Sequence, residues 1–151
     1  MTVTACTRVR LSGHIDVAVP PQRAFPLFTP AGERAWAEGW DPQFPCPAAD
    51  DTDPGAVFVT RHGDHATTWV VTGREPPAAI RYVQVTPGRR AGVVSVGCQL
   101  AAAGTRVTVC YDLTALTPEA NAELDRFAAG YPHFLASWEQ AIARAIARAS
   151  G

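Results

Sequence analysis

The chain has 151 residues, a formal net charge of −1 at pH 7, and thirteen basic residues that are all arginine. This length predicts a single domain over residues 1–151, able to bury about two-thirds of its unfolded surface without a disulfide or metal. The near-neutral charge argues against a nucleic-acid binder, whose domain carries a basic patch and a pI above about 9. No apolar run approaches the about 18 residues of a membrane span, and the first residues lack a signal-peptide core. We therefore expect a cytoplasmic protein with no membrane insertion.

The four cysteines are too widely spaced for a common metal or redox motif. Cys6, Cys46, Cys98 and Cys110 form no CxxC pair, which argues against a zinc site. A reducing cytoplasm keeps such residues as thiols, and we expect them to act mainly as buried small hydrophobes. We expect no cofactor and no metal.

The N-terminal third begins as a strand and continues as two short helices. From Arg8 to Pro20, apolar and polar residues alternate with a period of two, which predicts a half-buried strand. Consecutive prolines then end the strand and favour a short helix over Gln22–Phe28. The sequence Thr29-Pro30 predicts a second helix, with Thr29 as a cap, ending at Gly39.

A Pro- and Asp-rich stretch follows the second helix. The segment DPQFPCPAADDTDPG predicts a loop, with room for one short edge strand. Its aspartates, Asp50, Asp51 and Asp53, do not have the spacing of a calcium loop, so we interpret them as solvated.

The middle of the chain predicts a set of antiparallel strands. Two alternating segments flank Gly63-Asp64, a typical hairpin turn, and a second hairpin is predicted around residues 102–104. Together with the first strand, these segments predict a sheet of six to seven strands.

The last third predicts a long amphipathic helix from Pro118 to Ala149. Apolar residues recur at three- and four-residue steps from Leu124 to Ile146. Gly130 and Pro132 interrupt this stripe and predict a bend.

This order of elements predicts an α+β fold of the helix-grip type. A twisted antiparallel sheet must cover its apolar face, and only the C-terminal helix is long enough to do so. We expect the sheet to curl around this helix and the two short helices to close one end. Such a shape leaves room for a cavity.

Several segments of the chain resemble the START-like (SRPBCC) superfamily, the helix-grip fold of the birch pollen allergen. They are HIDVAVPPQRAFPLFTPAGERAWAEGWDP, WVVTGREPPAAIRYVQVTPG, and GTRVTVCYDLTALTPEANAELDRF followed by YPHFLASWEQAI. The FTP-GE--W--GW-P and TALT-E-N signatures are similar to a largely uncharacterised bacterial branch. The resemblance implies the fold and a ligand cavity, but no particular reaction, because one fold hosts many functions.

Aromatic side chains are the main candidates for a ligand-binding site. Residues expected on the inner face of the sheet, on the second short helix and on the long helix form this candidate set: Trp36, Trp40, Phe58, Trp69, Tyr82, Gln84, Tyr111, Tyr131, Phe134 and Trp138. Gln84 stands out because a polar side chain on an apolar face needs a partner or a ligand. Each aromatic residue has a second interpretation as plain core.

Candidates for catalysis are few. His14, His62 and His65 are expected to point outward, and His133, at the predicted bend, is the one histidine that we would test. No Ser-His-Asp order, phosphate-binding glycine loop or HExxH motif is present.

Three functions fit these observations. The first is a small-molecule-binding protein that takes a hydrophobic or aromatic ligand, oriented by Tyr82, Gln84 or Tyr131. The second is an enzyme of the cyclase or dehydratase type that uses a tyrosine or His133. The third is a protein-interaction module like the chaperone co-activators. The sequence permits a homodimer through an edge strand or the acidic loop, as well as a monomer.

Overall fold

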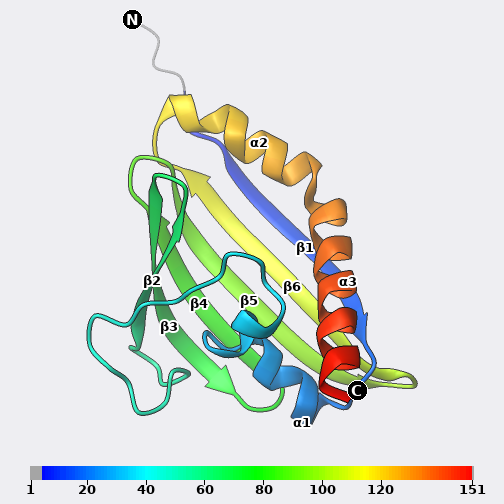
Figure 1. Ribbon diagram of the computed structural model, residues 1–151. Helices are drawn as coiled ribbons and strands as arrows, with labels where there is room; N and C mark the ends of the chain where they lie inside the picture. Colours follow the sequence, from blue (N-terminus) through cyan, green and yellow to red (C-terminus); the bar gives the residue numbers. More distant parts are fainter. Residues whose placement is uncertain (1–4, 151) are drawn as a thin grey trace, which may run out of the picture.

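The computed structural model describes residues 5–150 and confirms the predicted helix-grip fold (Figure 1). Six strands form one antiparallel sheet in the order β1-β6-β5-β4-β3-β2. The strands are β1 (Arg8–Val17), β2 (Val57–His62), β3 (His65–Glu75), β4 (Ala79–Thr86), β5 (Arg90–Ala101) and β6 (Gly104–Ala115). The helices are α1 (Pro21–Ala24), α2 (Asn121–Ala129) and α3 (Tyr131–Ser150), and the 3-10 turns are η1 (Phe25–Phe28), η2 (Gly32–Ala35) and η3 (Pro118–Ala120).

The two predicted hairpins set the register of the sheet. His62 pairs with His65 across Gly63-Asp64, and Ala101 pairs with Gly104 across the second turn. Gly63 has a φ of 58°, which side chains other than glycine rarely adopt. An isolated bridge between Gln43 and Val59 adds the short edge pairing expected in the Pro-rich loop.

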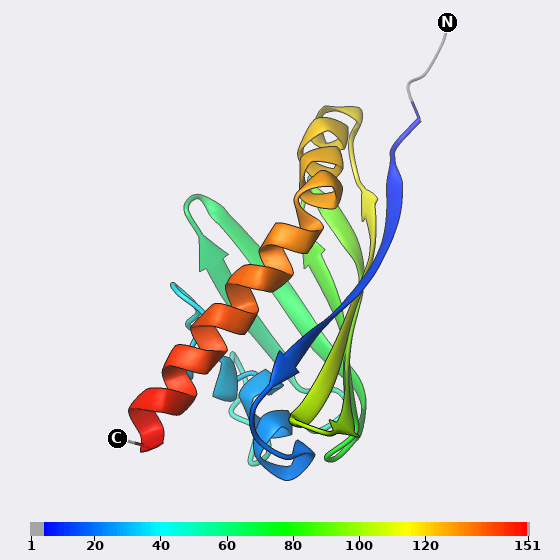
Figure 2. The ribbon, with the colours of Figure 1, turned by 90° about the vertical axis from the view of Figure 1, so that its right-hand side faces the viewer.

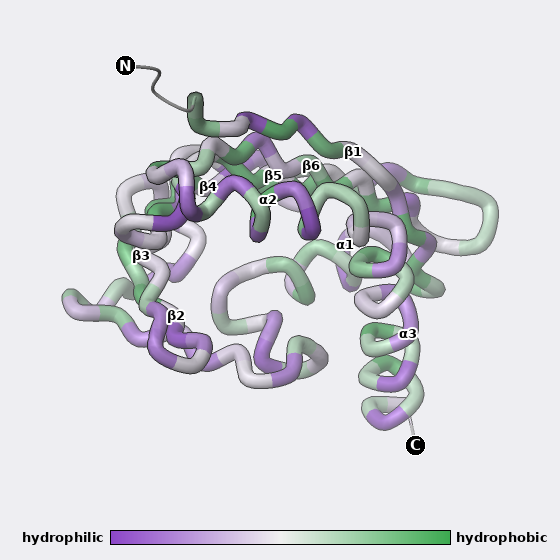
Figure 3. Tube along the Cα trace, turned by 90° about the horizontal axis from the view of Figure 1, so that it is seen from above, coloured by the Kyte–Doolittle hydropathy of each residue, from purple (hydrophilic) through white to green (hydrophobic). Residues whose placement is uncertain are grey.

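The sheet curls, and α3 covers only one side of its concave face (Figure 3). Helix α3 packs mainly on β1. Gly13 in β1 allows this approach, because a Cβ there would lie 2.5 Å from Leu135 Cδ1. The far edge, formed by β2 and β3, is therefore left for another segment to close.

The C-terminal helix bends where Gly130 and Pro132 predicted. Helix α2 ends at Ala129 and α3 begins at Tyr131, and the two run in different directions (Figure 2). Pro132 lies in the first turn of α3, where no amide donor is needed. No helix among residues 5–150 is long and apolar enough to cross a membrane.

The second short helix is shorter than predicted. The expected helix ending at Gly39 is the single 3-10 turn η2, because Trp36 has a φ of −139° and leaves the helical conformation. The predicted role of Thr29 is correct in part, since its Oγ1 accepts a hydrogen bond from the Gly32 amide at 3.1 Å. The first helix also divides, into α1 and η1, with Pro26 in η1.

The expectation of buried cysteines is wrong for two of the four. Cys98 is buried, which raises the pKa of its thiol to about 11, whereas Cys6 and Cys46 are exposed. All four are free thiols.

A close backbone contact fixes η2 against η1. A Cβ added at Gly32 would lie 1.7 Å from the Pro26 carbonyl oxygen, so no other residue fits without a backbone shift. This contact determines where the residues that follow Gly32 point.

We predict that Gly32→Ala lowers the free energy of unfolding by about 1–3 kcal/mol, because backbone atoms must move to admit the methyl group. Chemical denaturation measures this change. Gly97→Ala is the matched control, since a Cβ there meets Ala78 O at an ordinary 3.8 Å. Equal stability of both variants would contradict the close contact between Gly32 and the Pro26 carbonyl oxygen.

Candidate functional site

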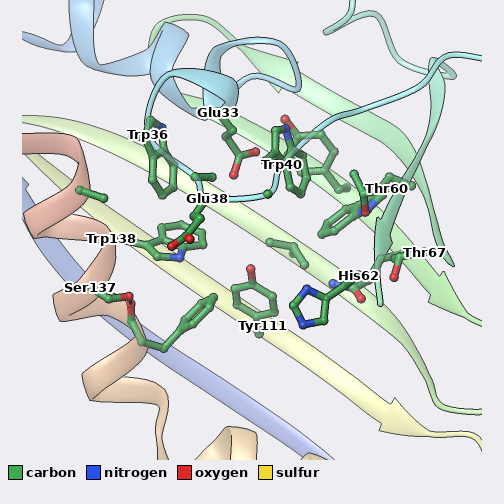
Figure 4. A pocket seen from close by; sticks show the side chains of 18 of the residues that line it. Glu33, Trp36, Glu38, Trp40, Thr60, His62, Thr67, Tyr111, Ser137 and Trp138 are labelled. Carbon is green, nitrogen blue, oxygen red and sulfur yellow. Dashed lines mark hydrogen bonds between the residues drawn. The ribbon is translucent and has the colours of Figure 1, made fainter. Parts of the chain in front are cut away.

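A pocket of about 600 Å³ lies between the sheet, α3 and the segment that follows η1. Strands β2 to β6 form its floor and one wall, α2 and α3 contribute the opposite wall, and residues 33–40 cover one end (Figure 4). This volume is in the range of about 300–1,000 Å³ that is typical of small-molecule sites.

Most residues of the predicted ligand-binding set line this pocket. They are Trp36, Trp40, Trp69, Tyr82, Gln84, Tyr111, Phe134 and Trp138. Phe58 does not line it, because its fully buried ring is enclosed by the rings of Phe44, Trp40 and Trp69, at 5.5, 6.0 and 5.8 Å. Tyr131 lies instead beside a smaller groove of about 330 Å³ between β1 and α3. Contact with a ligand remains a prediction for the whole set.

Trp36 and Trp40 join the two sides of the pocket. The Trp36 ring packs against Trp138 of α3 at 5.0 Å, and the Trp40 ring packs against Trp69 of β3 at 5.6 Å. Their Nε1 atoms donate hydrogen bonds to the Leu27 and Pro30 carbonyl oxygens, at 2.7 and 2.8 Å. With the indole donors satisfied, the rings present apolar surface to the pocket.

Both hydroxyl groups expected to orient a ligand, those of Tyr82 and Tyr131, are already bonded to the backbone. Tyr82 donates to the Phe28 carbonyl at 2.9 Å, and Tyr131 donates to the Val109 carbonyl at 2.6 Å. These bonds tie the sheet to η1 and α3 to the sheet. Gln84 differs, because its buried Oε1 has no partner among the described residues.

Glu33 is a pocket residue that the sequence analysis missed. Its carboxylate points into the pocket between Trp36 and Trp40 (Figure 4). Burial raises the pKa of this carboxyl well above its ordinary value. The available signal was its position between Thr29-Pro30 and Trp36, in a segment predicted to close one end of the fold.

The Tyr111 hydroxyl faces Glu33 from the opposite side of the pocket (Figure 4). Burial raises the pKa of this phenol, and the charge of a nearby Glu33 raises it further. The side chain therefore stays a neutral hydroxyl group, available as a hydrogen-bond donor.

The histidines lie at the edge of the pocket or away from it. His62 lines it, whereas His133, our candidate for catalysis, is exposed on α3 and does not. His65 accepts a hydrogen bond from Arg89 at 3.2 Å. Among residues 5–150, no group of three His, Cys, Asp or Glu side chains is arranged to hold a metal ion.

Residues 8–144 match the family model described as polyketide cyclase / dehydrase and lipid transport. The chain belongs to this family. The match confirms the resemblance to the START-like superfamily seen in the sequence. A search of curated proteins gives no significant match.

Solved bacterial structures share the fold of this family member. An uncharacterised protein from Rhizobium leguminosarum is 18% identical, with a TM-score of 0.70 over 95% of this chain and 99% of its own. A protein from Mesorhizobium loti is 17% identical, with a TM-score of 0.67 over 90% and 98%. A Staphylococcus aureus protein of unknown function is 10% identical, with a TM-score of 0.68 over 96% and 97%.

We predict that Glu33 makes stability depend on pH. Because its pKa is raised in the folded protein, its contribution to stability is fully present below the unfolded value. It is lost as pH rises through the folded value. Glu33→Gln removes this loss and becomes more stable than the wild type at high pH, by about 1.4 kcal/mol for each unit of pKa shift.

Denaturation curves of the two proteins over a pH series measure the effect. Glu119→Gln, at an exposed carboxylate outside the pocket, is the control. Parallel profiles of stability against pH for wild type and Glu33→Gln would contradict a raised pKa of Glu33 in the folded protein.

Proposed function

We propose that this protein binds a hydrophobic or aromatic small molecule in the pocket between the sheet and α3. The observation that carries this proposal is that all four tryptophans of the chain, Trp36, Trp40, Trp69 and Trp138, line one pocket. The rings pack against each other in two pairs, Trp36 with Trp138 and Trp40 with Trp69, and both pairs also border a space that a ligand can fill.

The energetics favour an apolar ligand with few polar groups. Apolar area removed from water contributes about 25 cal/mol per Å², so flat ring faces supply most of the affinity. Phe134 and Trp138 are half-buried and would lose further contact with water when a ligand covers them. Membership of a family described by cyclases and lipid transport is consistent with a hydrophobic ligand.

A second candidate function is an enzyme of the cyclase or dehydratase type that acts on a hydrophobic substrate in the same pocket. The observation that favours it is the Glu33 carboxyl in the pocket, because its raised pKa brings it nearer to the range useful for general acid–base catalysis. Chemical conversion of a bound molecule by the wild type, absent in Glu33→Gln, would support it.

We predict that 2-ethylnaphthalene, an uncharged apolar probe, binds with one molecule per chain. Trp69→Ala and Trp138→Ala should each weaken this binding about tenfold or more, corresponding to about 1.4 kcal/mol of lost ring contact. Isothermal titration calorimetry measures the affinity.

Val93→Ala, at an exposed position of β5 outside the pocket, is the control and should bind as the wild type does. Absence of binding to the wild type would refute the proposed function. Unchanged affinity in both tryptophan variants would place the probe elsewhere.

A further inference from the structure

Three polar groups of the pocket have hydrogen-bonding capacity that the described residues leave unused. Glu33 and Tyr111 direct their oxygen atoms into the pocket from opposite sides (Figure 4). Burial is the cause of the Glu33 pKa shift, and no hydrogen bond from a described residue contributes to the shift of either group. Gln84 is 1% exposed, and its Oε1 is unpartnered. The buried Gln84 Oε1 carries a penalty as long as it stays unpaired, whereas the oxygen atoms of Glu33 and Tyr111 are open to the pocket.

Both facing groups are hydrogen-bond donors when they are protonated. The raised pKa of the Glu33 carboxyl favours its protonated form, which presents one O–H donor to the pocket. The Tyr111 phenol stays protonated for the same reason and presents a second. A carbonyl oxygen has two lone pairs and can accept both hydrogen bonds at once.

We propose that the bound molecule is an uncharged aromatic compound with a carbonyl oxygen, which accepts hydrogen bonds from the Glu33 carboxyl and the Tyr111 hydroxyl that face each other across the pocket. This inference rests on the proposed function and names the ligand class. Trp36 and Trp40, on either side of Glu33, would hold the aromatic rings next to the carbonyl group.

The charges around the pocket favour a neutral ligand over an amine. Aromatic rings beside a carboxylate also suit an ammonium group through cation–π contact. However, three arginines, Arg61, Arg90 and Arg144, line the pocket together with Glu38 and Glu33. Their positive charge opposes a cation, and Arg90 already lies over the Phe127 ring at 5.1 Å.

Other titratable groups face the same pocket, so their effects on the pH dependence of binding must be distinguished from that of Glu33. His62 on β2 lines the pocket, as do Tyr82 on β4, Arg90 on β5 and Arg144 on α3. Asp51 lies close enough to raise the pKa of Tyr82, and its Oδ2 accepts a hydrogen bond from the Ala31 amide. Because His62 is an ionisable group in the same pocket, substitution of Glu33 itself is needed to assign an effect of pH to Glu33.

The test compares three probes of one shape by titration calorimetry. They are 2-acetylnaphthalene, which carries the carbonyl, 2-ethylnaphthalene, which lacks it, and 1-(2-naphthyl)ethylamine, which carries an ammonium group. The readout is the ratio of the ethyl to the acetyl dissociation constant. At about pH 6 we expect a ratio of about ten, the value for two hydrogen bonds partly offset by desolvation.

Two substitutions of Glu33 separate the donor from the charge. Glu33→Met removes the donor and should reduce the ratio to about two or less, because only the Tyr111 hydroxyl remains. Glu33→Gln keeps a neutral N–H donor and should retain the ratio. Glu119→Gln, outside the pocket, should match the wild type.

The pH profile gives an independent readout. From about pH 5 to about pH 9, a range that covers the raised pKa values of buried carboxyls, the wild-type ratio should fall as Glu33 loses its proton. The ratio of Glu33→Gln should stay constant, whereas a pH dependence that persists in this variant would assign the effect to His62.

The outcomes distinguish this inference from the proposed function. A wild-type ratio near one with tight binding of 2-ethylnaphthalene would overturn the inference of a carbonyl ligand and leave the proposed function standing. Tightest binding of the amine would overturn it in favour of a cation site. Failure of all three probes to bind would overturn the proposed function as well. A ratio near ten that Glu33→Met abolishes would establish the inference.

Discussion

The pocket depends on ring contacts that Trp36 and Trp40 make with its two opposite walls. Trp36 meets Trp138 on α3, and Trp40 meets Trp69 on β3. Because α3 packs on β1, it cannot also cover β2 and β3, and the short segment with these two tryptophans bridges the distance. The spacing of four residues lets one segment contact both walls while Glu33 points between them (Figure 4).

The position of this segment depends on backbone contacts as much as on apolar burial. Gly32 meets the Pro26 carbonyl, and the two indole nitrogens donate to carbonyl groups of the same region. The Tyr82 hydroxyl adds a hydrogen bond from the sheet to the Phe28 carbonyl. Together these contacts fix the rings in one arrangement, which reduces the conformational entropy that a ligand must remove on binding.

The fold could be predicted from the sequence because its signals are local. Alternation in the strands, glycine turns in the hairpins and a long apolar stripe each depend on neighbouring residues. The length of η2 could not be predicted from the sequence. Trp36 leaves the helix and contacts Leu27 and Trp138, and no local pattern encodes these contacts. The strand pattern predicted that Phe58 and Trp69 face inward. It could not predict that Phe44, from the Pro-rich loop, packs on Phe58 and helps to exclude it from the pocket. Glu33 was missed because its place in the pocket depends on the two tryptophans that flank it in space.

The indole signals of a nitrogen–proton correlation spectrum test the central claim most directly. The chain has four tryptophans and all four line the pocket, so every indole N–H signal reports on this site. If the pocket holds aromatic ligands, addition of 2-ethylnaphthalene will shift all four indole signals together, with saturation at one molecule per chain. Backbone shifts elsewhere with unmoved indole signals, or no shifts at all, would contradict a ligand site between the sheet and α3.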